Sequence, residues 1–195
     1  MAAAVSHDTV IHRIVRPPVR LAARTRVTPN HITTVRLLTG VAAAICFAEG
    51  TRGWLVLGGF VFLLSMLLDR ADGELARQTG QMSDWGYRYD LASDCIASML
   101  TFIGLGIGLA AGHAAALWLG LLAGVGIGAL FLELNVLNLA SVRGYPIGLG
   151  LTADPDDAMV FVPILIWLGL AWPMLVAAAV ITPLAALAVA LLGRR

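Results

Sequence analysis

The stretch LLDRADGELARQTGQMSDWGYRYDLASDC, residues 67–95, decides how this chain folds. It lies between two very apolar segments and carries five aspartates, of which four share a helical spacing: Asp69, Asp72, Asp90 and Asp94. A carboxylate at bilayer depth costs on the order of 2.5 to 3.5 kcal/mol on insertion scales, and four neighbouring carboxylates also repel one another. The aspartates therefore require cationic partners.

The composition is that of an integral membrane protein. Of 195 residues, 59% are hydrophobic and 13% are charged, and the mean hydropathy is +0.86, whereas soluble domains carry about 25% charged residues. We expect one membrane domain over residues 30–195 after a juxtamembrane segment over residues 1–29, because no linker divides the chain. Cys46 and Cys95 fall within apolar segments and are expected to be small buried residues.

Six apolar segments predict an all-α integral membrane protein with six transmembrane helices. Backbone groups at bilayer depth must be hydrogen-bonded within their own segment, and about 20 apolar residues cross a bilayer as a helix. The expected limits are His31–Ala48, Trp54–Ala76, Trp85–Ala111, Ala114–Ala140, Ala158–Ala171 and Pro173–Leu192. The fifth span is short, and little more than Pro173 separates it from the sixth.

The positions of the arginines, the only basic residues besides histidine, predict the orientation. Five of them precede the first apolar segment. A cytoplasmic N-terminus with six spans also places Arg77, Arg143 and both C-terminal arginines on the cytoplasmic side, as the positive-inside rule requires, and leaves Arg52 outside. We therefore expect a protein of the cytoplasmic membrane whose aspartates face the cytoplasm.

The segment from Thr9 to Arg26 mixes arginines with apolar residues. An amphipathic helix lying on the anionic inner leaflet is one interpretation, and a polar flexible tail is the other. Pro17 and Pro18 are expected to interrupt such a helix.

The spacing of the aspartates places them on two helix faces. One face of the second predicted helix carries Asp69, Asp72, Gly73, Ala76 and Arg77, and one face of the third carries Gly86, Asp90 and Asp94. A tight loop joins these helices, so the faces can meet and gather four carboxylates. Hard oxygen ligands suit Mg²⁺ or Mn²⁺, and carboxylates shared by two ions about 4 Å apart form a two-metal site for phosphoryl chemistry.

Three small residues and one arginine accompany the acids. Gly73, Ala76 and Gly86 leave the facing helices without side-chain bulk where a ligand would enter, and glycine lets a backbone approach closely. Arg77, at the membrane surface, can make a bidentate bond to a phosphate.

From Asp69 to Asp94 the sequence resembles the signature of the CDP-alcohol phosphotransferase family. Its fixed positions read Asp, two residues, Asp-Gly, two residues, Ala-Arg, eight residues, Gly, three residues, Asp, three residues, Asp, and all of them are matched. The segment TPNHIT, residues 28–33, is similar to the start of the family's first helix.

The resemblance implies roles for these residues. Asp69, Asp72 and Asp90 would hold the metal ions, and Asp94 would take the proton from an attacking hydroxyl and could share a metal. The pocket for the cytidine diphosphate would be lined by Gly73, Ala76, Arg77 and Gly86, with Asn30 and Thr33 as further candidates.

The expected activity is a transferase reaction of phospholipid biosynthesis that uses two Mg²⁺ or Mn²⁺ ions. An acceptor alcohol would attack the β-phosphate of a CDP-alcohol, and CMP would leave. CDP-diacylglycerol with a small polar acceptor is the favoured arrangement, while a CDP-linked headgroup given to a lipid alcohol stays open. The next cytoplasmic loop holds candidates for acceptor recognition: Arg143, Asp154, Asp156 and Asp157. The resemblance also suggests a homodimer, and no nucleic-acid partner is expected.

Two other classes of function stay open. Carboxylates within a membrane can form a cation or proton pathway, and such a transporter would move its substrate without releasing CMP. A structural salt-bridge network would have to draw on Arg70, Arg77 and Arg88, the arginines expected to be near enough to the acids. These are too few to neutralise four aspartates together with Glu74 and Asp84.

The remaining polar residues near the membrane have less specific interpretations. Arg70 and Arg88 lie off the aspartate faces and are expected to pair with Glu74 or to meet lipid headgroups. His31 is expected to pack at the interface. Three polar residues of the fourth span would bridge helices or line the acceptor cavity: Glu133, Asn135 and Asn138.

Overall fold

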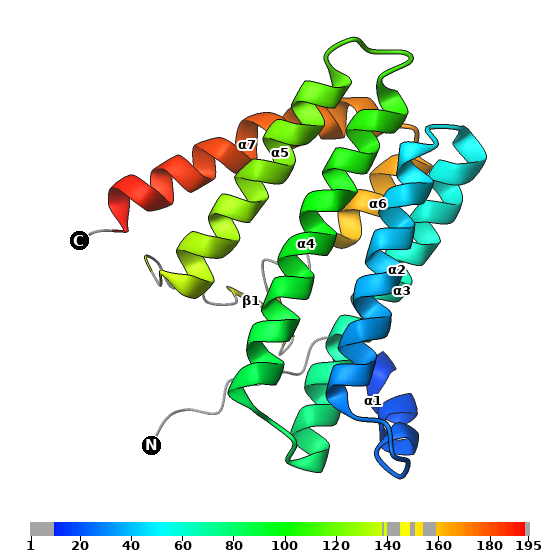
Figure 1. Ribbon diagram of the computed structural model, residues 1–195, viewed down its shortest axis with the longest axis vertical. Coiled ribbons are helices and arrows are strands. Elements are labelled where there is room, and N and C mark those ends of the chain that lie inside the picture. Colours follow the sequence, from blue (N-terminus) through cyan, green and yellow to red (C-terminus); the bar gives the residue numbers. More distant parts are fainter. Residues whose placement is uncertain (1–9, 138, 140–144, 149–150, 154–158, 194–195) are drawn as a thin grey trace.

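The computed structural model describes residues 10–137, 139, 145–148, 151–153 and 159–193 (Figure 1). These residues form helices apart from one short antiparallel hairpin. The elements are α1 (Val10–Ala22), α2 (Pro29–Ala48), α3 (Arg52–Thr79), α4 (Asp84–Leu109), α5 (Ala116–Phe131), its π-helical continuation η1 (Leu132–Val136), β1 (Tyr145–Gly148), β2 (Leu151–Ala153), α6 (Phe161–Trp167) and α7 (Ala171–Leu192).

The all-α membrane architecture is confirmed. Within the described residues, five helices are long and apolar enough to cross a membrane: α2, α3, α4, α5 with η1, and α7. The segment expected to form the fifth span contains α6, a helix of seven residues, which is shorter than the roughly 20 residues that a full span requires. Residues 154–158, which precede it, lie outside the described part.

The ends of the site-forming helices follow from local chemistry. Pro29 opens α2, where its missing N–H removes no helical bond, and the His31 Nδ1 accepts the Thr28 backbone N–H at 3.3 Å. Gly80 ends α3 in the left-handed region, with φ of 67°. Ser83 then caps α4 by accepting the Gly86 N–H at 3.0 Å. The tight loop between α3 and α4 is therefore fixed by its own residues.

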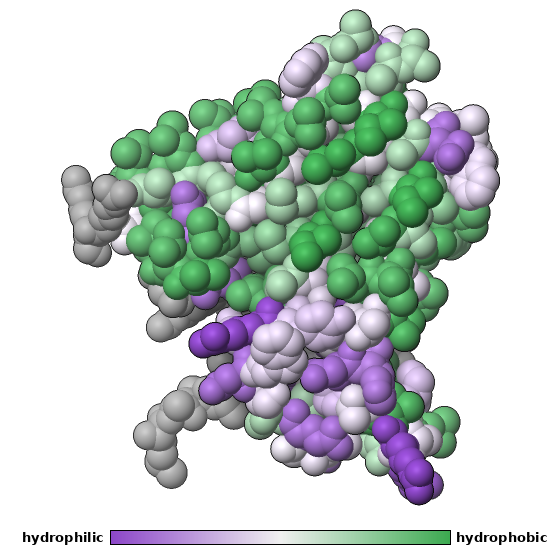
Figure 2. Space-filling model, viewed as in Figure 1, coloured by the Kyte–Doolittle hydropathy of each residue, from purple (hydrophilic) through white to green (hydrophobic). Residues whose placement is uncertain are grey.

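Helix α2 packs along both α3 and α4, while α4 packs on α5 and α5 on α7. The expectation that α3 and α4 would simply face each other is therefore incomplete, because α2 lies against both of them (Figure 1). Figure 2 shows apolar residues over most of the visible face and hydrophilic residues gathered at one end. That end holds α1 and the loop between α3 and α4.

The predicted amphipathic helix is present as α1, but the expected interruption at Pro17 and Pro18 is wrong. Both prolines lie inside one helix that runs from Val10 to Ala22. Each proline removes one backbone hydrogen bond. Packing offsets that loss, because Val15 and Val19 are buried against Leu75 of α3. The N-terminal helix is thereby fixed beside the polar end of the bundle.

Candidate active site

Three aspartates from two helices lie close enough to share a cation. Asp69 and Asp72 of α3 and Asp90 of α4 each offer a carboxylate oxygen, and these oxygens all lie within 4.8 Å of one another. Asp72 is buried, with 3% of its surface exposed, and the other two are half-buried. We call these residues the three-aspartate cluster. An all-oxygen donor set of this kind fits Mg²⁺ or Mn²⁺.

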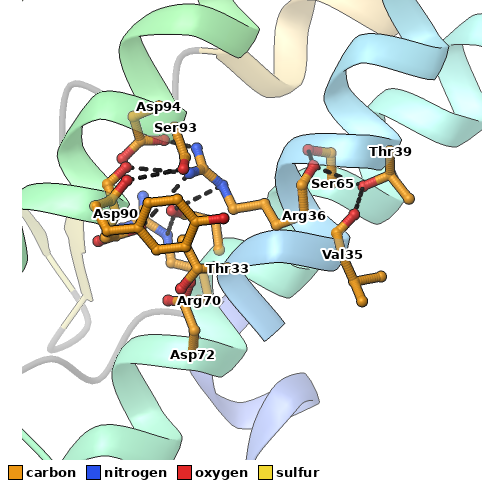
Figure 3. Close-up of polar contacts among 12 residues, drawn as sticks. Thr33, Val35, Arg36, Thr39, Ser65, Arg70, Asp72, Asp90, Ser93 and Asp94 are labelled. Atoms are coloured by element: carbon orange, nitrogen blue, oxygen red, sulfur yellow. Dashed lines mark hydrogen bonds and ion pairs between the residues drawn. The ribbon is translucent and has the colours of Figure 1, made fainter. Parts of the chain in front are cut away.

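Arg36 of α2 extends into the same site, beside Asp90 and Asp94 (Figure 3). Its guanidinium pairs with Asp94, with Asp69 at 3.3 Å from Nε to Oδ1, and with Asp90 at 3.5 Å from Nη1 to Oδ1. Nη1 also donates to the Asp90 carbonyl oxygen at 3.4 Å. Only 5% of the Arg36 side chain is exposed. One buried arginine therefore contacts three of the four aspartates.

Arg36 corrects the expectation that only Arg70, Arg77 and Arg88 could pair with the acids. The spacing argument considered the second and third predicted helices and so missed a residue of the first. A signal was available, because Arg36 is a single charge inside an apolar segment, and such a charge requires a partner within the bundle. One guanidinium still leaves the four carboxylates with excess negative charge.

Thr33 lies one helical turn before Arg36 and holds the third aspartate. Its hydroxyl donates to the Asp72 Oδ2 at 2.7 Å, and both side chains are buried. The sequence offered Thr33 as a further candidate for contact with the nucleotide, and its hydroxyl contacts a carboxylate of the three-aspartate cluster. Such a bond fixes the orientation of a ligating carboxylate.

Asp94 occupies a different position from the cluster. It is one turn beyond Asp90 on α4, and Arg36 binds its carboxylate. Among the described residues, the group that can share one ion consists of Asp69, Asp72 and Asp90. The geometry thus separates one carboxylate from the other three.

Arg77 lies beside Gly73 and is held by Glu74. A Cβ on Gly73 would lie 3.5 Å from the Arg77 Nη1, while Nη2 donates to the Glu74 Oε2 at 3.0 Å. Glu74 is buried and also accepts from Gln78 at 2.9 Å. Arg16 of α1 lies 3.6 Å from its other oxygen. Glu74 thus connects α1 to Arg77, a role that the sequence pattern did not indicate.

The other expected arginine contacts are confirmed in part. Arg70 lies 3.8 Å from Asp69, through Nε and Oδ2. The sequence counted Arg70 among the arginines near enough to pair with the acids and also offered Glu74 or lipid headgroups as its partners, and the contact with Asp69 agrees with the first of these expectations. Arg88 is exposed on α4.

Gly86 allows the beginning of α4 to approach the beginning of α2. A Cβ at this position would lie 3.2 Å from the Asn30 Oδ1 and 3.0 Å from the Ser83 Oγ. Asn30, Gly86 and the half-buried Ala76 therefore lie near the polar ends of α2, α4 and α3. Side-chain bulk at Gly86 would press on the Asn30 amide.

The candidate acceptor residues are mostly beyond the described part of the chain. Arg143, Asn138, Asp154, Asp156 and Asp157 all lie outside the described residues. Glu133 and Asn135 lie in η1, where both are half-buried. The Asn135 amide donates to the Phe131 carbonyl oxygen at 3.3 Å, which is a contact within its own helix.

Comparison with known proteins gives a match along nearly the whole chain. The family model described as CDP-alcohol phosphatidyltransferase matches residues 26–192. A phosphatidylinositol phosphate synthase of Cutibacterium acnes is 30% identical over 107 residues, which cover 54% of this chain and 50% of that protein. One of Streptomyces avermitilis is 31% identical over 100 residues, which cover 51% and 40% respectively. The chain thus spans about half the length, or less, of these curated relatives.

Solved structures share the fold. Apo phosphatidylinositol phosphate synthase of Mycobacterium tuberculosis aligns with a TM-score of 0.67 at 21% identity, over 90% of this chain and 95% of that one. The same protein with CDP-DAG bound gives 0.67 at 22%, over 93% and 90%. Its complex with manganese and citrate gives 0.64 at 21%, over 92% and 88%.

The match includes both aspartate faces, Arg36 and Thr33. The signature from Asp69 to Asp94 lies wholly within the matched residues 26–192. This chain therefore belongs to the CDP-alcohol phosphatidyltransferase family.

Proposed function

We propose that this protein transfers a phosphatidyl group from CDP-diacylglycerol to an acceptor alcohol and releases CMP. The observation that carries the proposal is the three-aspartate cluster, whose oxygens lie within 4.8 Å of one another. It lies within the segment that matches the family, beside the separate carboxylate of Asp94.

Asp69, Asp72 and Asp90 would hold Mg²⁺ or Mn²⁺. Bound divalent ions would neutralise the diphosphate and stabilise the leaving CMP. The Thr33 hydroxyl would keep the Asp72 carboxylate turned toward the site through its 2.7 Å bond. The complex of the Mycobacterium tuberculosis protein with manganese and citrate, which shares the fold, supports a divalent metal as cofactor.

Asp94 is our candidate for the general base. It would accept the proton of the acceptor hydroxyl while that oxygen forms a bond to the β-phosphorus. The bond from this phosphorus to the oxygen of CMP would break, and CMP would leave with the bonding electron pair. Arg36 holds the Asp94 carboxylate beside the cluster, which fits a base that acts next to the metal-bound diphosphate.

Arg77 and the small residues would bind the cytidine diphosphate. The Arg77 side chain is 36% exposed, so its guanidinium can reach a phosphate from its position beside Gly73. Gly86, Ala76 and Asn30 lie near the polar helix ends and would line the rest of the pocket.

A lipid-linked donor is supported by an apolar cavity next to the site. The cavity has a volume of about 260 Å³ and lies between α1, α2 and α3. Its lining is Val15, Pro18, Val19, Ala22, Ile32, Leu67, Leu68 and Ala71. Leu68 and Ala71 directly precede Asp69 and Asp72 on α3, so the cavity and the cluster lie at the same level of this helix. The Mycobacterium tuberculosis structure with CDP-DAG bound supports the same donor.

Inositol phosphate is the first acceptor to test, because both curated relatives are phosphatidylinositol phosphate synthases. Serine, glycerol phosphate and neutral alcohols are the other candidates. The arginines of the N-terminal segment favour an active site that faces the cytoplasm. In that position a water-soluble acceptor can meet a donor that stays in the membrane.

The test uses purified full-length protein with CDP-diacylglycerol, Mn²⁺ or Mg²⁺, and each acceptor in turn. CMP and the lipid product are measured. We expect CMP and one new phospholipid with a single preferred acceptor, loss of both with a chelator, and recovery on addition of metal. If CMP is released with none of the acceptors while the protein moves cations across vesicles, the transporter interpretation replaces this one.

A further inference from the structure

We propose that Arg36 is a positioning residue that holds Asp94 apart from the three-aspartate cluster and whose charge limits how tightly that cluster binds a divalent cation. The inference rests on the proposed metal-dependent function. It concerns a residue of α2 that lies outside the aspartate signature on α3 and α4.

Both the backbone carbonyl and the guanidinium of Arg36 are held by neighbouring side chains. Its carbonyl oxygen accepts the Ser65 hydroxyl of α3 at 2.9 Å and the Thr39 hydroxyl at 2.8 Å. Its guanidinium contacts Asp69, Asp90 and Asp94. Because 5% of the side chain is exposed, a turn away from the acids would leave the charge without solvent or partner. Arg36 is therefore built into the site, as Figure 3 shows.

Arg36 contacts carboxylates of both groups, the three-aspartate cluster and the separate Asp94. Asp72 is held by Thr33 and belongs to the cluster. Asp94 is held by Arg36 and lies outside that group. Asp69 and Asp90 contact Arg36 and also belong to the cluster. The same guanidinium thus fixes the candidate base and touches two candidate metal ligands.

A fixed positive charge beside metal ligands has two opposing effects. Without a cation, it reduces the repulsion among the carboxylates. With a divalent cation bound, it repels that cation across a few ångströms in a medium less polar than water. Removing the charge should therefore destabilise the metal-free protein and tighten cation binding. A residue that only supports the fold would lower stability to the same extent with and without metal.

The experiment compares wild-type protein with Arg36→Gln and Arg36→Lys. Mn²⁺ affinity is measured by electron paramagnetic resonance without substrate, and the unfolding temperature is measured with chelator and with saturating Mn²⁺. For Arg36→Gln we expect a lower unfolding temperature in chelator, a larger rise on adding Mn²⁺, and Mn²⁺ binding tighter by roughly fivefold or more. For Arg36→Lys, which keeps the charge, we expect Mn²⁺ affinity close to the wild-type value.

The lysine variant also tests the positioning of Asp94. An ammonium group is a compact point charge and cannot span Asp69 and Asp94 as the guanidinium does. Its kcat should therefore fall at least several-fold while the KM for CDP-diacylglycerol stays near the wild-type value. Unchanged kcat would overturn the positioning role. Arg36→Lys also provides this readout if the glutamine variant fails to fold.

The charge effect is overturned if Arg36→Gln binds Mn²⁺ no more tightly than wild type. It is also overturned if the unfolding temperature of Arg36→Gln lies below that of wild type by the same amount in chelator and in saturating Mn²⁺. Absence of Mn²⁺ binding in both proteins would overturn it together with the metal-dependent function. A protein that binds Mn²⁺ but releases CMP with none of the acceptors would refute the proposed reaction alone. The binding comparison would still decide the charge effect of Arg36.

Discussion

The two ends of the α2–α4 pair are held together by different forces. At the end away from the site, a Cβ added to Gly104 would overlap the Ala44 carbonyl oxygen, and one added to Gly108 would overlap that of Phe47. The backbones themselves are in contact there. At the site end, α2 reaches α4 through the ion pairs of Arg36 with Asp90 and Asp94.

This difference indicates which end supplies stability and which supplies chemistry. In a membrane, close packing of small residues is a main source of helix association. Buried ion pairs contribute little net stability, because desolvation opposes their attraction. We therefore expect substitutions at the glycine end to act through folding alone. Substitutions at the charged end should change metal binding and turnover, in addition to any stability lost when a buried charge is left without its partner.

The largest effect is expected from Asp94→Asn. Loss of a general base typically costs about 10²- to 10⁴-fold in rate, so CMP release should fall by that order while the protein still purifies as a folded species. Asp84→Asn is the matched control, because Asp84 is exposed in the first turn of the same helix. Wild-type turnover in the Asp94 variant would refute the assigned base.

The glycine end can be broken by Gly108→Ala. The added methyl group would overlap the Phe47 carbonyl oxygen and crowd the backbone of Gly50, and overpacking of this kind costs about 1 to 3 kcal/mol or more. Thermal unfolding in detergent should show a clearly lower midpoint. Gly53→Ala is the control, because no atom lies within 4 Å of a Cβ there. Equal unfolding midpoints for the two variants would contradict the conclusion that close backbone contact between α2 and α4 stabilises this end.

The charged end could be predicted from the sequence only in part. The spacing of Asp69, Asp72 and Asp90 identified three residues that the structure brings together. Helical periodicity shows which residues share a helix face, and the short loop between α3 and α4 brings the two faces to the same end of the bundle. The ion pairs of Arg36 join residues far apart in the chain, and no local spacing shows that α2 packs against both α3 and α4.

Helix α1 shows a second limit of local rules. Two adjacent prolines predicted a break, yet packing of Val15 and Val19 on Leu75 keeps the helix continuous. The long apolar helices, in contrast, were predicted closely, because length and hydropathy alone determine whether a segment can cross a membrane. The continuity of α1 and the ion pairs of Arg36 depend instead on tertiary contacts, which local sequence patterns do not show.

A smaller effect is expected from Thr33→Val. The substitution keeps the shape of the side chain but removes the hydroxyl that donates to Asp72. Loss of a hydrogen bond to a metal ligand typically lowers metal affinity about 10- to 100-fold. We expect the Mn²⁺ affinity of Thr33→Val to fall by about tenfold, the smaller end of that range. Thr34→Val is the control, because the Thr34 hydroxyl is exposed and bonds to the Asn30 carbonyl and to Tyr89. Equal Mn²⁺ affinity in both variants would show that Thr33 does not orient a ligand.

The smallest effect is expected from Glu74→Gln, which tests whether the site extends to α1. The neutral amide would hold Arg77 and Arg16 less firmly than the carboxylate does. Arg77 is partly exposed, and pairs of this kind contribute up to about 1 kcal/mol, so the KM for CDP-diacylglycerol should rise by at most about fivefold with kcat nearly unchanged. Glu49→Gln is the control at the opposite end of α2, where Glu49 is exposed. A fall in kcat with unchanged KM would instead place Glu74 in the chemical step, and the chemistry would then extend beyond the contacts of α2 with α4.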